Sequence, residues 1–187
     1  MGYVYFSKKD YFVTLKTTGG LLFFDTDVKK QLVKNRILEA SKKQHIRIAA
    51  YAVLSNHYHL LLRGESWDAV PKFLQLVNGG SAYLLNKMEG LEGRGVWDKR
   101  FAKPINTEVG LYNVTGYILG NPLKHGMVKD LVGLYNYEFC NYSDVVKERG
   151  LEYVDNMIHQ TIVMNLDLET EEAGLSAVEG LSVPSSR

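Results

Sequence analysis

Several features that would restrict the class of this protein are absent from its sequence. The chain contains one cysteine, Cys140, which excludes an intramolecular disulfide and a zinc site built from cysteines. No apolar run approaches the ~18–20 residues that a membrane-spanning helix needs, and the N-terminus lacks the apolar core of a signal peptide. The sequence also has no P-loop pattern for binding nucleoside triphosphates. We therefore expect a cytoplasmic protein that does not enter a membrane.

Basic residues are scarce in one part of the chain. From Leu151 to Arg187 seven acidic residues accompany a single basic residue, while residues 1–150 hold 21 basic and 14 acidic residues, a net charge of +7. A basic body suits a polyanionic partner, although many basic domains bind none. This change in charge divides the chain into a domain over residues 1–150 and an acidic, partly flexible tail over residues 151–187. The flexible part is expected from Glu169 onward.

Apolar patterns predict a β-α-β-β order in the first part of the chain. Tyr11 to Thr17 is rich in β-branched and aromatic residues and predicts a strand. Asp27 to about Lys43 has apolar residues at helical spacing with lysines between them, which predicts an amphipathic helix. Ile46 to Leu54 and the run from His57 to Gly64 are two apolar strands. The short turn between them predicts an antiparallel hairpin.

The second part of the chain continues this alternation. Trp67 to about Met88 predicts a second helix, and Val96 to Lys103 predicts a short edge strand with its loop. A third helix begins near Thr107, and Pro122 predicts that it ends at about Gly120-Asn121, because proline disfavours a helical conformation in the residue before it. The β-α-β-β-α-β-α order predicts an α+β fold, a ferredoxin-like sandwich with an antiparallel sheet and helices on one face.

The predicted strand after the turn begins with two histidines separated by one residue. Successive side chains of a strand point to opposite faces, so His57 and His59 share one face and Tyr58 takes the other. Two neighbouring imidazoles can chelate one divalent ion. A histidine pair on a strand also commonly forms a half-buried polar face, and the spacing alone leaves both interpretations open.

The predicted third helix carries a second group of candidate residues. Tyr117 and Asn121 are four residues apart and therefore share one helix face, with ~5–6 Å between their Cβ atoms. The amide of Asn121 offers an oxygen to a hard cation, and the phenol of Tyr117 becomes a nucleophile when ionised. His125 follows beyond the predicted end of this helix and could either contact DNA or occupy a turn before Gly126.

Basic and aromatic residues supply candidate contacts to a nucleic acid. Each charged residue could instead be a solvated surface residue that binds no DNA. The candidates for phosphate contacts are Arg63, Lys72, Lys99, Arg100, Lys103 and Lys124, and those for base stacking are Trp97 and Phe101.

Four motifs in a fixed order resemble a known family. They are a Tyr-Phe-Val-Thr-Leu strand, an Asn-His-Tyr-His-Leu-Leu-Leu strand, a Val-Trp-Asp-Lys-Arg-Phe loop and a Tyr-Ile-x-x-Asn-Pro-x-x-x-Gly segment. This order resembles the single-tyrosine HUH transposases, and among them the REP-associated tyrosine transposase branch, over about Tyr3 to Tyr142. Two places depart from the usual pattern of the branch. Its members often have a histidine or another polar residue at the position of Leu119, and commonly Val-Arg-Ala where this chain has Leu123-Lys124-His125.

The resemblance implies a role for each candidate residue. His57 and His59 would be metal ligands, Asn121 a third ligand and Tyr117 the nucleophile. Members of the family cut single-stranded DNA next to an imperfect hairpin, leaving a 5′-phosphotyrosine and a free 3′-hydroxyl. Two imidazoles and one amide oxygen leave positions open for phosphate and water, which suits Mg²⁺ or Mn²⁺.

The function expected from the sequence is that of a transposase-like endonuclease that cleaves and rejoins single-stranded DNA near hairpins. Two alternatives remain open at this point. A domesticated protein could bind the hairpin without turnover, or a metal-dependent nuclease could use water in place of Tyr117. The expected partner is single-stranded DNA with a hairpin, and a homodimer is an open alternative to a monomer.

Overall fold

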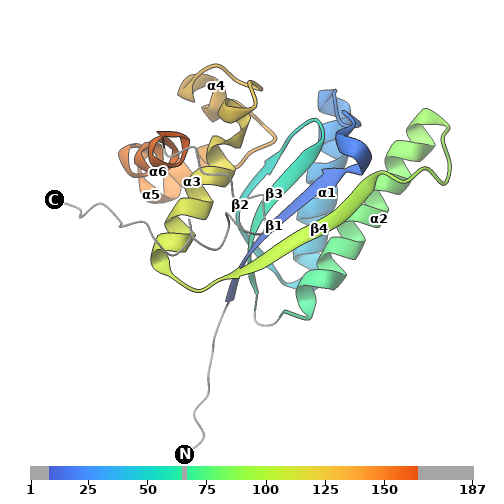
Figure 1. Ribbon diagram of the computed structural model, residues 1–187, viewed down its shortest axis with the longest axis horizontal. Coiled ribbons are helices and arrows are strands. Elements are labelled where there is room, and N and C mark those ends of the chain that lie inside the picture. The colour runs from blue at the N-terminus through green and yellow to red at the C-terminus, as the bar shows by residue number, and fades with distance from the viewer. Residues whose placement is uncertain (1–8, 65–66, 164–187) are drawn as a thin grey trace, which may run out of the picture.

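The computed structural model describes residues 9–64 and 67–163 of the chain. Four strands form one antiparallel sheet with the order β2-β3-β1-β4, so the histidine strand β3 lies inside the sheet. The strands are β1 (Lys9–Thr17), β2 (Arg47–Val53), β3 (His57–Gly64) and β4 (Trp97–Ile105). Together with helices α1 (Asp27–Gln44) and α2 (Ala69–Glu89), they have the βαββαβ order of a ferredoxin-like fold. The α+β class and the antiparallel sheet predicted from the sequence are confirmed (Figure 1).

The turn between β2 and β3 is held by backbone hydrogen bonds from neighbouring segments. The amide of Leu54 donates to the carbonyl of His57 across the turn, at 2.9 Å. The amide of Thr17 donates to Asn56 and that of Phe24 to Ser55, each at 2.8 Å. These bonds satisfy the backbone of a buried turn, and they fix the first residue of β3, His57, in register with the end of β1.

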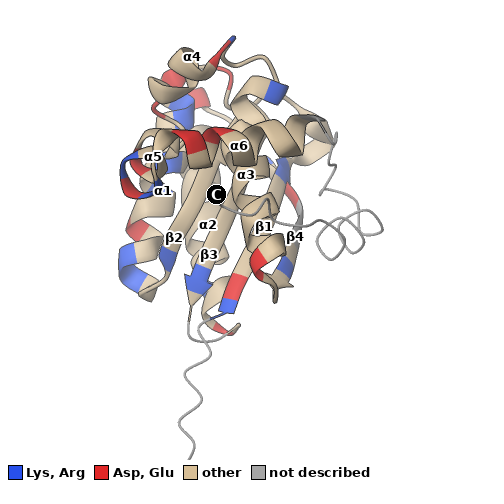
Figure 2. Cartoon of the chain, turned by 90° about the vertical axis from the view of Figure 1, so that its left-hand side faces the viewer, with Lys and Arg blue, Asp and Glu red and all other residues tan. Residues whose placement is uncertain are grey.

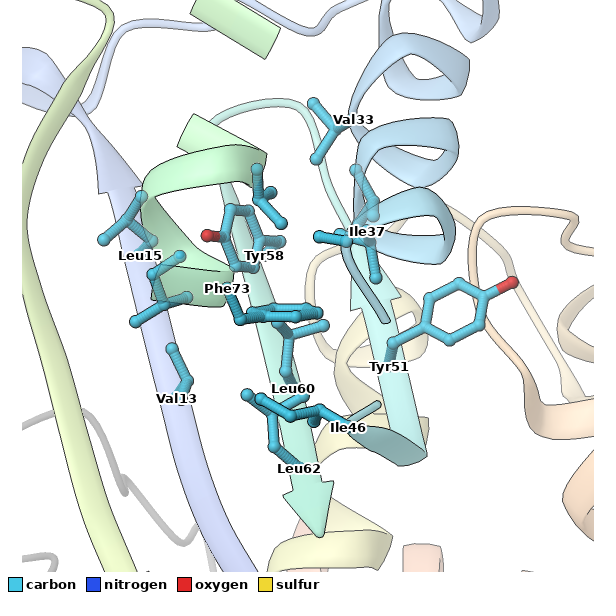
Figure 3. Close-up of a cluster of buried hydrophobic side chains, with 14 of the residues drawn as sticks. Val13, Leu15, Val33, Ile37, Ile46, Tyr51, Tyr58, Leu60, Leu62 and Phe73 are labelled. Atoms are coloured by element: carbon cyan, nitrogen blue, oxygen red, sulfur yellow. The ribbon is translucent and has the colours of Figure 1, made fainter. Parts of the chain in front are cut away.

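Strand alternation separates the core into two clusters, one on each face of the sheet. On the first face, Tyr58 and Leu60 pack with Phe73 and Ile37 beneath α1 and α2 (Figure 3). On the second face, Leu61 packs among residues of the other cluster. Because side chains of β3 alternate, His57 and His59 lie on this second face. The prediction that they share one face opposite Tyr58 is confirmed.

A second helical layer covers the face that carries the histidines. In Figure 1, α1 and α2 lie on one side of the sheet, as the sequence predicted, and the remaining helices lie on the other side. The sequence predicted helices on one face only, whereas the apolar residues of this second layer cover Phe12 and Leu61 on the other face. Its members are α3 (Glu108–Lys124), α4 (Leu131–Tyr135), α5 (Tyr142–Arg149) and α6 (Leu151–Val163). None of the described helices is long and apolar enough to cross a bilayer.

Helix α3 continues past its proline to Lys124, so the predicted end at Gly120-Asn121 is wrong. A proline inside a helix removes one backbone donor, but the ladder resumes when the amide of His125 donates to the carbonyl of Asn121 at 3.0 Å. Burial of residues 110–122 holds this part of the helix in place. The extra turn carries Lys124 and His125 to the histidine end of the sheet.

Helix α6 shows that the predicted tail starts too early. Leu151–Val163 is a helix whose Val154, Met157 and Ile158 are buried against α3 and α5. Helices α3 and α6 approach closely at Gly116, because a Cβ there would lie 2.7 Å from the carbonyl carbon of Met157. Residues 151–163 therefore belong to the folded domain. The remainder of the predicted tail, from residue 164, lies outside the described residues.

Candidate active site

The two histidines are buried side by side at the start of β3. His57 is 4% exposed and His59 is 0% exposed, and their ring centroids are 4.8 Å apart. Tyr58 between them points into the opposite core, where its hydroxyl donates to Asn78 Oδ1 at 2.6 Å. Burial raises the pKa of the Tyr58 phenol well above its usual value. Tyr58 is therefore a core residue and not a nucleophile.

Each imidazole is held in place through Nδ1 by an oxygen atom. His57 Nδ1 lies 2.7 Å from Asn56 Oδ1, and His59 Nδ1 lies 2.8 Å from Thr14 Oγ1. The amide of Asn56 is oriented because its Nδ2 donates to the carbonyl of Gly20 at 3.1 Å. An amide oxygen only accepts, so His57 Nδ1 carries the hydrogen, and Nε2 is the atom with a lone pair for a metal. Such bonds at the ring nitrogen that does not bind the metal are typical of metal-binding histidines.

Tyr117 projects from α3 onto the same face. Its ring centroid lies 5.3 Å from that of His59 and 6.0 Å from that of Phe12, and both contacts are edge-on. The Nζ atom of Lys124 lies 5.2 Å from the ring centroid of Tyr117. The structure therefore brings the predicted nucleophile, one predicted ligand and one predicted basic residue into a single cluster.

Asn121 lies one helical turn after Tyr117 and is fully buried. Its Nδ2 donates to the carbonyl of Tyr117 at 3.1 Å. Its Oδ1 is buried and accepts no hydrogen bond from any described residue. A buried oxygen without a donor costs free energy unless a ligand or water meets it, and a hard cation is one such ligand.

The neighbours of Asn121 on α3 contact both histidines. One turn earlier Tyr117 packs against His59, and one turn later His125 packs against His57, with ring centroids 4.8 Å apart. This arrangement places Asn121 on the stripe of α3 that runs past the histidine pair. No group of three or more His, Cys, Asp or Glu residues suited to a metal occurs in the described ranges. The candidate donors are instead two imidazoles and one amide oxygen, and their convergence on one ion stays a prediction.

The residues predicted to contact DNA are divided between the two faces of the sheet. Trp97 lies on the first face, where it stacks on Phe24 at 4.9 Å and donates from Nε1 to Ser81 Oγ at 3.0 Å. Trp97 is partly buried against the core cluster of that face, and its role in base stacking stays a prediction. Lys72 is exposed on α2, which covers that same face.

Other predicted contacts lie on the histidine face or in β4. Arg63 follows His59 by four residues along β3 and pairs with Asp10 through two bonds of 2.8 Å, which raises the pKa of its guanidinium. Lys103 lies opposite Phe12 in the β1–β4 pair. Lys99, Arg100 and Phe101 are β4 residues, and the side chains of these three lie outside the described part of the structure.

Two supporting residues were missed by reasoning from the sequence. Asn56 and Thr14 orient the imidazoles, yet neither was assigned a role. Asn56 directly precedes His57, so its presence in the Asn-His-Tyr-His motif was a usable signal. Thr14 is distant in sequence, and only the antiparallel pairing of Thr14 with His59 reveals its contact.

Comparison with known proteins identifies the class to which this fold and site belong. The family model for IS200-like transposases matches residues 21–121, more than half of the chain. The chain therefore belongs to the IS200-like transposase family. No curated protein matches it.

One solved structure supports the same fold. The chain is similar to a REP-associated tyrosine transposase solved with a REP hairpin, with 19% identity and a TM-score of 0.59 over 81% of this chain and 87% of that one. It also matches a putative transposase from Deinococcus radiodurans R1, with 18% identity and a TM-score of 0.45 over 63% of this chain and 94% of that one. The resemblance to the REP-associated branch inferred from the motifs is confirmed at the level of the fold.

Proposed function

We propose that this transposase cleaves and rejoins single-stranded DNA beside a hairpin through a covalent bond between Tyr117 and a 5′-phosphate. The observation that carries this proposal is the contact of the Tyr117 ring with His59, in a cluster where Asn121 Oδ1 has no donor among the described residues. A nucleophile next to a set of neutral metal ligands is the arrangement that transfer of a phosphodiester needs.

The proposed reaction is a reversible transesterification. The phenolic oxygen of Tyr117 attacks phosphorus and loses its proton. The bond from phosphorus to the 3′-oxygen breaks, and that oxygen leaves with the electron pair and takes up a proton. One phosphodiester replaces another, so the reverse attack by a 3′-hydroxyl rejoins the DNA without a nucleoside triphosphate.

Five residues would form and support the metal site. His57, His59 and Asn121 would hold Mg²⁺ or Mn²⁺, which would polarise the phosphate and stabilise the leaving oxygen. Asn56 and Thr14 orient the imidazoles through Nδ1.

Two neighbours of Tyr117 would support the nucleophile. The ammonium of Lys124 over the Tyr117 ring would hold the ring in place through a cation–π contact. Phe12 packs against the edge of that ring and restricts its orientation.

We further propose that the DNA partner carries a hairpin. The REP-associated transposase with a similar fold was solved with one, and the first 150 residues of the chain have a net charge of +7. Lys103 and Lys124 are two described lysines on the histidine side that would contact phosphates.

Burial of the site favours a second candidate function. Tyr117 is 3% exposed and His59 is 0% exposed, so a scissile phosphate reaches them only if the surroundings rearrange. A protein that binds the hairpin without turnover requires no such rearrangement.

Cleavage of a labelled hairpin with single-stranded flanks in Mn²⁺ would separate the two functions. His57→Ala should reduce cleavage by more than the ~10–100-fold typical of changes beyond the direct ligands, while hairpin binding persists because phosphate contacts supply most of the affinity. His159, which is exposed on α6, provides the matched control His159→Ala. Binding without any cleavage by the wild-type protein would support the second candidate.

A further inference from the structure

A small cavity lies on the histidine face of the sheet, between β2, β3, α3 and α5. Its volume is about 80 Å³, and its apolar wall includes Leu61 and Val145. Three arginines line it: Arg47 from β2, Arg63 from β3 and Arg149 at the end of α5. The cavity therefore has a mixed apolar and polar lining and is cationic where the arginine side chains converge.

Two of the three arginines already have acidic partners. Arg47 pairs with Glu148, which also lines the cavity, at 3.3 Å. Arg63 pairs with Asp10, and Figure 2 shows acidic colour at the start of β1 beside the basic arrowhead of β3. Arg149 forms no ion pair with any residue in the described ranges.

These charges leave the cavity positive. Three cations and one carboxylate line it, and Asp10 adds a second negative charge close by. Like charges held close together repel each other, so an anion bound between the guanidinium groups would lower the electrostatic energy.

The size of the cavity selects the kind of anion. A volume of about 80 Å³ exceeds the ~30 Å³ share of one water molecule and is far below the ~300–1,000 Å³ of sites for larger ligands. A single phosphate group matches this range. Guanidinium groups also bind phosphate oxygens through paired N–H donors.

A larger groove of about 440 Å³ adjoins the cavity and shares Arg47 and Glu148 with it. The groove also contains Lys34 and Asp144, so its two cations are balanced by two carboxylates. An anion would therefore prefer the smaller cavity, and the groove would suit an uncharged part of the same ligand.

We propose that Arg47, Arg63 and Arg149 form a subsite for one backbone phosphate of the DNA substrate, distinct from the phosphate that Tyr117 attacks. This inference rests on the proposed function for its DNA partner. Arg63 lies four residues beyond His59 on the same face, which corresponds to about 13 Å along the strand. One phosphate cannot occupy both places, so the subsite would bind a phosphate elsewhere on the DNA and help to position it.

Salt dependence of hairpin binding tests the subsite separately from catalysis. Arg149→Gln is the primary variant, because Arg149 is exposed and its loss leaves no described acidic residue unpaired. Loss of one phosphate contact should reduce the slope of log affinity against log salt concentration by about 0.7–0.9. Arg36→Gln is the control, since it also removes one arginine, and Arg36 lies on α1, away from the cavity, where it pairs with Glu39. An unchanged slope for Arg149→Gln would overturn the proposal.

Two further measurements separate the possible outcomes. Formation of the covalent adduct at saturating DNA should be the same for Arg149→Gln and the wild-type protein. The salt slope is measured on binding alone, so failure of the proposed chemistry would not hide a change in it. Inorganic phosphate is tested separately by its effect on the melting temperature. A phosphate-induced increase that Arg149→Gln abolishes, combined with an unchanged salt slope, would identify a site for free phosphate and contradict the DNA subsite.

Discussion

The contact between α3 and α6 predicts that Gly116→Ala destabilises the protein. A Cβ at residue 116 would overlap the carbonyl oxygen of Met157 and lie 2.7 Å from its carbonyl carbon. These are backbone atoms of α6, which cannot rotate away as a flexible side chain could. Overpacking of this kind costs ~1–3 kcal/mol, whereas replacing glycine by alanine within a helix favours folding by ~1 kcal/mol. The severity of the overlap places the net loss at about 1–2 kcal/mol.

Gly79→Ala is the matched control for this prediction. Gly79 lies within α2, is exposed, and a Cβ there would have no atom within 4 Å. This variant should therefore gain up to ~1 kcal/mol from helix propensity alone. For a chain of this size, Gly116→Ala should lower the melting temperature by about 2–8 °C, while Gly79→Ala raises it slightly. Equal stabilisation of both variants would show that α6 does not pack on α3 as described.

Three further predictions concern other parts of the chain. Asn113 is fully buried, and neither polar atom of its side chain has a hydrogen-bond partner among the described residues. Asn113→Leu should therefore raise the free energy of unfolding in urea by ~1–3 kcal/mol. A decrease would indicate a buried water at this position. Deleting residues from Glu169 onward should leave DNA cleavage unchanged or increase it, because the acidic segment would repel DNA; loss of cleavage by a folded truncated protein would refute this. Hydrogen bonds from Lys29 and Arg94 lower the pKa of Glu89. The stability from Glu89 is therefore present above its unfolded pKa and lost as the pH falls through its folded value. Glu89→Gln should reduce the loss of stability at acid pH, measured in thermal scans, by at most ~1 kcal/mol. An unchanged dependence of stability on pH would refute this role.

Much of the fold and most of the candidate site could be predicted because they depend on local patterns. The period of two in β3 places His57 and His59 on one face, and the structure confirms it. The spacing of four residues places Tyr117 and Asn121 on one stripe of α3, where Tyr117 meets His59. Alternation and helical spacing act within a single element, so the sequence alone is sufficient for them.

The features that were not predicted depend on contacts between distant segments. Pro122 remains helical because the residues around it are buried, which overrides the local preference for a helix end. Charge composition placed a boundary at Gly150, although apolar residues such as Met157 pack α6 against α3. The aromatic ring of Trp97 suggested base stacking, and only the strand register shows that this partly buried side chain packs beside Phe24.

The identity of the nucleophile is the central claim, and mapping of the covalent adduct tests it most directly. A single-stranded hairpin substrate is incubated with Mg²⁺ and the wild-type protein, Tyr117→Phe or Tyr112→Phe, and the linked tyrosine is located by mass spectrometry. Tyr112 is the control because it is also buried on α3, where it packs against Tyr153 and not against a histidine. The account predicts an adduct on Tyr117 in the wild-type protein and in Tyr112→Phe, and none in Tyr117→Phe. Cleavage by Tyr117→Phe without an adduct would show that water attacks the phosphate, and an adduct on another tyrosine would contradict the role assigned to Tyr117.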